Sequence, residues 1–188
     1  MFLSRSIKFP VFTGNFFDYF CFIWYSIPMR KSVFFVGFDY QLIKKISMQV
    51  SDSLDMYFLD INDLIAYNIK KSDVIEKIGI EYYDKEIKKI VLSACSYENT
   101  IVNIPYDLFS QKDYYTKITQ NNFVVYIRQD IENLQNKNQN ISDKKMDVAL
   151  LVFEELDKII IKNSNKVVDF KNYQDVIKVL SKILKNLY

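Results

Sequence analysis

The chain contains no histidine among its 188 residues. This absence excludes serine–histidine–aspartate triads, imidazole general bases and histidine-ligated zinc within the chain. Its two cysteines, Cys21 and Cys95, lie far apart in the sequence and lack the short spacing of metal ligands. We interpret them as buried free thiols in a reducing compartment, while the sequence leaves a disulfide between them open.

Glycine is also scarce, with only 3 residues in the chain. Phosphate-binding loops and tight turns depend on glycine because it adopts positive φ angles easily, so the chain has little material for them. The formal net charge is +2, and we therefore expect no nucleic-acid partner. A hydrophobic share of 49% and a charged share of 26% are ordinary for a globular protein.

The first 28 residues differ from the rest of the chain. Their aromatic run, 16–25, is interrupted by Asp18 and followed by Pro28, so it falls short of the ~20 residues that span a bilayer. We expect no membrane span, no signal peptide and a cytoplasmic protein. We interpret 1–28 as an aromatic extension outside the core, upstream of a natural start at Met29, with a partner-binding or interfacial segment as the alternative. The folded domain is then 29–188.

Beyond residue 28, apolar strands alternate with amphipathic helices. Expected strands cover 32–36, 56–59, 100–104, 123–127 and 167–170. Expected helices cover 41–54, 63–69, 72–78, 81–94, 112–119, 142–160 and a closing helix capped by Asn172. This alternation predicts an α/β domain with right-handed crossovers and a parallel sheet.

The segment after the first strand stands where a phosphate-binding loop, G-x-x-x-x-G-K-[ST], would be expected. Gly37 supplies the first glycine, but Leu42, Ile43 and Lys44 stand at the positions of the second glycine, the lysine and the hydroxyl. Lys44 and Lys45 could only replace the lysine by turning back, and a helix rotates each residue by about 100° from its predecessor. We therefore interpret both as solvent-facing lysines on a helix.

Two downstream motifs carry a family resemblance. Residues 58–65, Phe-Leu-Asp-Ile-Asn-Asp-Leu-Ile, are similar to F-[IL]-D-x-D-x-[LI]-I, and 72–84 resemble the segment that follows it in the shikimate kinase family. The chain resembles that family over roughly residues 30 to 185. The resemblance implies a three-layer P-loop kinase-like domain with a five-stranded parallel sheet of order 2-3-1-4-5, and ligands above the carboxyl ends of the strands.

The resemblance also implies roles for individual residues. Asp60 matches the aspartate that organises magnesium near the reacting hydroxyl, and is the candidate catalytic and metal-binding residue. Asn62 and Asp84 match substrate-binding positions, held in the family by an aspartate and by an arginine that binds the shikimate carboxylate. Gly37, Lys44 and Lys45 are the candidate nucleotide-binding residues of a degenerate loop.

Further departures concern the substrate contacts and the lid. A glycine triplet of the family is replaced by 105–107, Pro-Tyr-Asp, and the polar stretch 135–140 lacks the arginine of the family's mobile lid. We therefore expect no cofactor, and a binding or regulatory module whose partner is an unknown protein or small molecule. The alternative is an active small-molecule kinase that uses Mg-ATP to phosphorylate shikimate or a related alcohol with an atypical loop.

Overall fold

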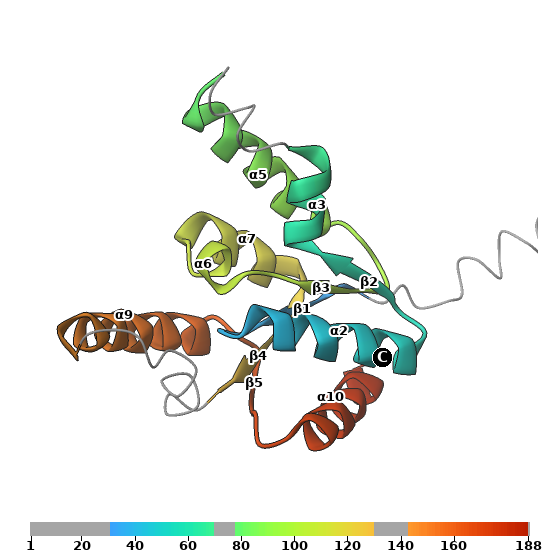
Figure 1. Cartoon of the computed structure of the whole chain (residues 1–188). Helices are drawn as coiled ribbons and strands as arrows, with labels where there is room; N and C mark the ends of the chain where they lie inside the picture. Colours follow the sequence, from blue (N-terminus) through green and yellow to red (C-terminus); the bar gives the residue numbers. More distant parts are fainter. Residues whose placement is uncertain (1–30, 70–77, 130–142, 188) are drawn as a thin grey trace, which may run out of the picture.

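A parallel sheet runs through the centre of the computed structural model, which describes residues 31–69, 78–129 and 143–187 (Figure 1). The strands are β1 (Val33–Val36), β2 (Tyr57–Asp60), β3 (Thr100–Asn103), β4 (Phe123–Arg128) and β5 (Lys166–Asp169). All of them pair in parallel, in the order β2-β3-β1-β4-β5. The structure thus confirms the predicted sheet order and the central place of β1.

The central strand is apolar on both faces because helices cover both sides of the sheet. Val33 and Phe35 point into one hydrophobic cluster, whereas Phe34 and Val36 point into the other. All four side chains have no exposed surface. Alternation along a strand sends neighbouring side chains to opposite faces, so this short segment belongs to two cores at once.

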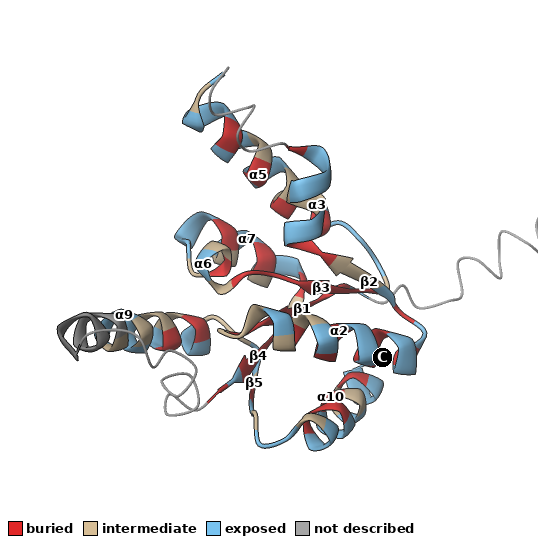
Figure 2. Cartoon of the chain, viewed as in Figure 1, coloured by how far each residue is buried: buried red, intermediate tan, exposed pale blue. Residues whose placement is uncertain are grey.

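Seven helices are described around the sheet. They are α2 (Tyr40–Leu54), α3 (Ile61–Asn68), α5 (Ile80–Ala94), α6 (Tyr106–Phe109), α7 (Lys112–Asn121), α9 (Asp143–Lys162) and α10 (Tyr173–Leu187). Helices α2 and α10 cover one face, and α3, α5, α6, α7 and α9 lie on the other (Figure 1). The buried residues of α2 and α10 face the sheet, as their apolar periodicity predicts (Figure 2).

Most predicted elements agree with the structure within a few residues. Asn172 accepts a hydrogen bond from the backbone N–H of Asp175 at 2.9 Å, which confirms it as the cap of α10. The short helix α6 was not predicted, and Cys95 is half-buried rather than buried. The expected helix 72–78 lies almost wholly outside the described residues, as do the polar stretch 135–140, the extension 1–28 and Cys21.

Candidate functional site

Polar side chains lie at the carboxyl ends of β2 and β3, beside the end of β1. Gly37 directly follows β1, Asp60 ends β2, and Asn103 ends β3. Asp60 and Asn103 are register partners, so parallel pairing alone brings them side by side. This edge is where open α/β sheets bind their ligands, and it is therefore the candidate site.

Helix α2 begins almost immediately after Gly37. Asp39 caps it, and its carboxylate accepts a hydrogen bond from the backbone N–H of Leu42 at 3.1 Å. The backbone N–H of Asp39 itself donates to Oε1 of Gln129 at 2.9 Å, and that of Ile43 donates to the Asp39 carbonyl at 3.0 Å. With the N–H of Tyr40, which donates to the Phe38 carbonyl at 3.1 Å, four N–H groups at this helix start are bound to protein oxygen atoms.

Ile43 fills the space beneath this turn. Its side chain has no exposed surface and belongs to the cluster between the sheet and α2. A Cβ atom on Gly37 would lie 2.7 Å from Ile43 Cδ1 and 2.8 Å from the carbonyl oxygen of Ile127. Glycine is therefore required at position 37 by close packing against these two residues.

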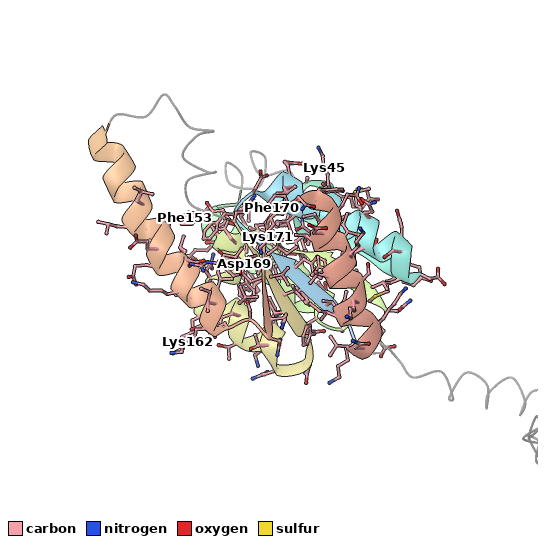
Figure 3. All side chains as sticks on the ribbon, turned by 90° about the horizontal axis from the view of Figure 1, so that it is seen from below. Lys45, Phe153, Lys162, Asp169, Phe170 and Lys171 are labelled. Carbon is pink, nitrogen blue, oxygen red and sulfur yellow. The ribbon has the colours of Figure 1, made fainter. Side chains whose placement is uncertain are left out.

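Aromatic rings pack against Phe38, the residue that follows Gly37. Phe38 stacks on Phe153 of α9 with ring centroids 3.7 Å apart, and it meets Tyr106 of α6 at 4.9 Å. Phe153 lies on the side of α9 that faces the body of the protein (Figure 3). This cluster joins the start of α2 to two other helices and stabilises the segment by burial of aromatic surface.

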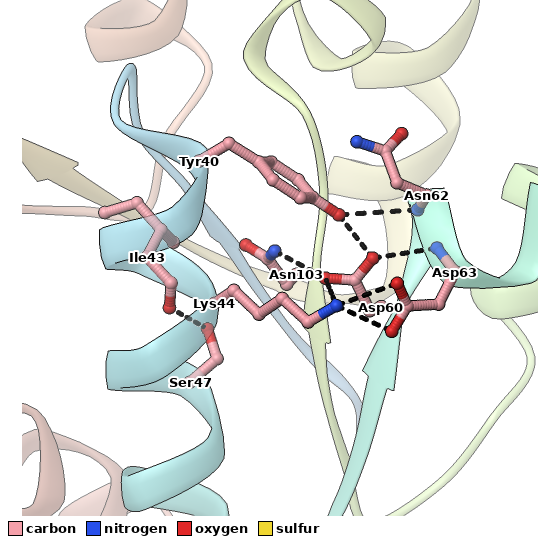
Figure 4. A network of polar contacts seen from close by, with 8 residues as sticks. All are labelled: Tyr40, Ile43, Lys44, Ser47, Asp60, Asn62, Asp63 and Asn103. Carbon is pink, nitrogen blue, oxygen red and sulfur yellow. Dashed lines mark hydrogen bonds and ion pairs between the residues drawn. The ribbon is translucent and has the colours of Figure 1, made fainter.

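Asp60 lies at the centre of a hydrogen-bond network (Figure 4). Its Oδ1 atom accepts from the Tyr40 hydroxyl and from the backbone N–H of Asp63, the latter at 2.9 Å. Its Oδ2 atom accepts from Asn103 Nδ2 at 2.9 Å and lies 3.6 Å from Lys44 Nζ. Oδ1 of this buried residue therefore accepts two hydrogen bonds, and Oδ2 accepts one hydrogen bond and forms an ion pair with Lys44.

Lys44 reaches across from α2 to two carboxylates. Its Nζ atom lies 2.8 Å and 2.6 Å from the two carboxylate oxygens of Asp63, in addition to its contact with Asp60. The hydrogen bond to Asp63 raises the pKa of Lys44, and the charge of Asp60 adds to this effect although burial opposes it. Lys44 is therefore held as an ammonium group between the two aspartates.

Tyr40 lies on the other side of Asp60. Burial raises the pKa of Tyr40 well above its ordinary range, and the hydrogen bond to Asp60 raises it further. The hydroxyl also accepts a hydrogen bond from the backbone N–H of Asn62 at 3.4 Å. Tyr40 thus stays protonated and connects the start of α2 with the start of α3.

The structure brings together only some of the residues singled out from the sequence. Asp60, Lys44 and the backbone of Asn62 meet at the end of β2, whereas Lys45 is exposed on α2 and Asp84 is exposed on α5. The interpretation of Lys44 as a solvent-facing lysine is wrong, because β2 places two carboxylates within its reach. Lys45 has the exposed position expected of it.

Sequence reasoning missed three members of the network, which are Tyr40, Asp63 and Asn103. Asn103 could have been found, since polar residues at the carboxyl ends of neighbouring parallel strands meet at one edge of the sheet. Asp63 follows Asp60 by one helical turn and could have been found from that spacing. The part played by Tyr40 depends on where α2 begins, which the motif comparison does not reveal.

The sequence of the chain matches the model of a known protein family. The sequence model of the family described as shikimate kinase matches residues 44–188. The chain belongs to the shikimate kinase family. The match begins at Lys44, so the segment from Gly37 to Ile43 precedes the matched residues of this family member. No curated protein sequence matches it.

Solved shikimate kinases have the same fold. The enzyme from Aquifex aeolicus is 19% identical with a TM-score of 0.67, and the match covers 82% of this chain and 96% of that one. The enzyme from Acinetobacter baumannii in complex with shikimate is 18% identical with a TM-score of 0.64, over 84% and 94% of the two chains. At these identities the likeness establishes the P-loop kinase fold alone.

Shikimate kinases use Mg-ATP, and the residues of this family member can be compared with what that cofactor requires. A phosphate loop needs converging backbone N–H groups, a lysine and a hydroxyl for magnesium. Here Asp39 and Gln129 bind N–H groups of the segment, Ile43 is buried, and Lys44 places an ammonium beside Asp60. These residues do not fit the triphosphate and its metal.

The described residues of the chain can also be compared with the requirements of a metal-binding group and of a membrane-spanning helix. Across residues 31–69, 78–129 and 143–187, no three acidic or cysteine side chains gather in a way that could hold a metal ion. Within the same ranges, no helix combines the length and the apolar character needed to cross a membrane.

Proposed function

We propose that this member of the shikimate kinase family does not transfer phosphate from Mg-ATP and acts in the cytoplasm as a binding or regulatory module. The observation that carries this proposal is the start of α2, where the Asp39 carboxylate occupies the N–H of Leu42 and Gln129 occupies the N–H of Asp39. An anion at this helix start would have to displace both contacts. The Asp39 carboxylate would also repel a phosphate group.

The size of the missing contributions supports the same conclusion. Phosphoryl transfer depends on positioning and on neutralisation of charge, and single groups that stabilise charge contribute roughly 10³-fold in such sites. Ile43 replaces one such group. Asp84, which is exposed on α5, stands at the sequence position of the arginine that binds the substrate carboxylate in the family, so that attraction is missing.

A second candidate function is an active small-molecule kinase that uses Mg-ATP on shikimate or a related alcohol. The retention of Asp60 at the end of β2 favours it, because a carboxylate at this place can act on a substrate hydroxyl. The three hydrogen bonds to Asp60 and its ion pair with Lys44 weigh against it, since a general base needs an accessible lone pair for the proton that it accepts.

Titration of the full chain with Mg-ATP distinguishes the two functions. We expect no heat of binding in calorimetry and no shikimate-dependent release of ADP, with an active shikimate kinase as the positive control of the assay. Micromolar Mg-ATP binding, or ADP release near the ~10 s⁻¹ typical of enzymes, would overturn the proposed function. Turnover with another alcohol would assign the second function with a changed substrate.

Restoring the missing lysine alone should not restore activity. We expect Ile43→Lys to show no ATP turnover, because the backbone N–H groups of the segment remain bound to Asp39 and Gln129. The substitution also places a charge at a fully buried position, so the variant should be compared at a temperature where circular dichroism shows it to be folded. Turnover by this variant would contradict the importance of the helix start.

A further inference from the structure

The ammonium group of Lys44 lies among oxygen atoms that suit a metal ion. Its Nζ atom is 2.6 Å from Asp63 Oδ2 and 3.6 Å from Asp60 Oδ2. In the phosphate-loop motif, the residue at this position carries the hydroxyl that binds magnesium. The ammonium group of Lys44 thus stands at the position where the hydroxyl of the motif would help to bind a magnesium ion from solution.

We propose that Lys44 is a built-in replacement for the divalent cation at this edge of the sheet, and that its removal uncovers a divalent-cation site. This inference rests on the proposed function, because a protein that binds Mg-ATP at this edge would need the metal there. It goes further in naming the residue that takes the place of the metal.

The burial of Asp60 explains why a cation is needed. Its side chain is 1% exposed, and a buried carboxylate without a compensating charge is strongly unfavourable. Tyr40 and Asn103 donate hydrogen bonds but carry no charge. Lys44 is the cationic side chain that contacts Asp60, so it supplies the compensation that a metal ion would otherwise give.

The amide beside Asp60 adds no charge. Asn103 is fully buried, and its Nδ2 atom donates to Asp60. Its Oδ1 atom has no hydrogen-bond partner among the described residues and is turned away from the carboxylate (Figure 4). The charge of Asp60 is therefore compensated by Lys44.

The available ligands suit a small divalent ion. Mg²⁺ and Mn²⁺ bind carboxylate and carbonyl oxygens, and Mg²⁺ is usually held by one or two carboxylates together with several waters. Asp60 and Asp63 supply two carboxylates. Metal–oxygen distances are about 2.1 Å for Mg²⁺, so an ion can enter only after the ammonium has left.

The test measures Mn²⁺ binding to the full chain by electron paramagnetic resonance, with no nucleotide present. Lys44→Ser removes the charge and supplies the hydroxyl of the motif. Lys44→Gln also removes the charge, but its amide can still donate to Asp63 and so protects the fold. Lys45→Ser is the matched control, because it removes the same charge one residue away from an exposed position.

We expect wild type and Lys45→Ser to bind Mn²⁺ weakly and alike. Lys44→Ser, or Lys44→Gln if the serine variant does not fold, should bind it on the order of tenfold more tightly, because a competing charge has left two carboxylates. Adding Asp63→Asn to either variant should abolish the gain. Asp63 is a suitable second site because its side chain is 67% exposed, so the change should leave the fold intact.

Two results would overturn the inference. One is equal Mn²⁺ binding by the folded Lys44 variants and by Lys45→Ser, and the other is a tight Mn²⁺ site in the wild-type chain that Asp63→Asn removes. Both differ from the failure of the proposed function, which is Mg-ATP binding by the unmodified protein. If the inference holds, a ligand that binds at this edge of the sheet in the wild-type chain should bind equally well with and without a chelator of divalent cations.

Discussion

The Tyr40 hydroxyl donates a hydrogen bond to the Asp60 carboxylate and so joins the first turn of α2 to the end of β2. The same carboxylate caps α3 through the backbone N–H of Asp63. One buried side chain therefore fixes the starting points of two helices. This double role gives Asp60 a structural reason to be an aspartate, separate from any catalytic one.

Loss of the Tyr40 hydroxyl should measurably weaken the fold. We expect Tyr40→Phe to lower the free energy of unfolding by about 2 kcal/mol, because the hydrogen bond has a charged, buried acceptor and is partly shielded from water. Urea denaturation followed by circular dichroism measures this. Tyr67→Phe is the control, since Tyr67 is 89% exposed and its change should stay within about 0.5 kcal/mol. Equal effects of the two substitutions would contradict the role of Tyr40.

The fully buried Tyr126 should make stability depend on alkaline pH. Its hydroxyl donates to Asp157 at 2.6 Å, and burial first and Asp157 second raise the pKa of Tyr126 well above its ordinary range. An unfolded tyrosine loses its proton near pH 10, at about its reference value. The contribution is therefore complete below about pH 10 and is lost as the pH rises from there toward the folded pKa.

Urea denaturation at several values between about pH 8 and 11 tests this dependence. Tyr126→Phe should show a shallower decline above about pH 10 than wild type, because one group that ionises only in the unfolded chain has been removed. Tyr67→Phe should keep the wild-type slope, since Tyr67 is exposed. A Tyr126→Phe slope equal to that of wild type would contradict the raised pKa.

Gly37 should not tolerate alanine. A Cβ at this position would lie within 2.8 Å of both Ile43 and the Ile127 carbonyl, so we expect Gly37→Ala to cost about 1–3 kcal/mol. The double variant Gly37→Ala/Ile43→Ala should lose less stability than the sum of the losses of the two single variants, because the clash between the two side chains is gone. Relief should be partial, since the Ile127 carbonyl stays. Strict additivity in thermal or chemical denaturation would show that the clash is absent.

Deletion of residues 1–28 should leave the melting temperature nearly unchanged. The family match covers residues 44–188 and does not include them, and β1 already pairs with β3 and β4 on its two sides. Scanning calorimetry of the full chain and of a chain that begins at Met29 gives the comparison. A loss of more than ~2 kcal/mol would mean that this segment packs against the core.

The predictable part of the fold depends on patterns that are local in the sequence. Strand β1 is apolar at every position, which indicates a central strand, and the apolar spacing of α10 follows its buried face closely. Helix α6 escaped prediction because four residues do not complete enough turns to show a period. Local pattern therefore predicted the strands, the helices and a parallel sheet, whereas the strand order and the role of Asp60 came from the family resemblance.

The contacts of the candidate site depend on relations that the sequence does not display. Lys44 was placed toward solvent because its position on α2 was known but the approach of β2 was not. Likewise, the cap formed by Asp39 depends on α2 starting at Tyr40, one residue earlier than the apolar spacing predicts. Both errors concern how segments meet in the folded chain. Helical periodicity predicts which way a side chain points but does not predict which residue it contacts.

The buried position of Ile43 also limits the mutational routes open to this segment. A lysine at 43 would place a charge in the core, and a glycine at 42 would weaken the first turn of α2 before any phosphate contact existed to offset the loss. Each single step toward the phosphate-loop motif thus passes through a less stable protein. Single substitutions toward the motif should therefore rarely persist in the segment from Gly37 to Lys44. A change toward the motif would need several substitutions that arise together.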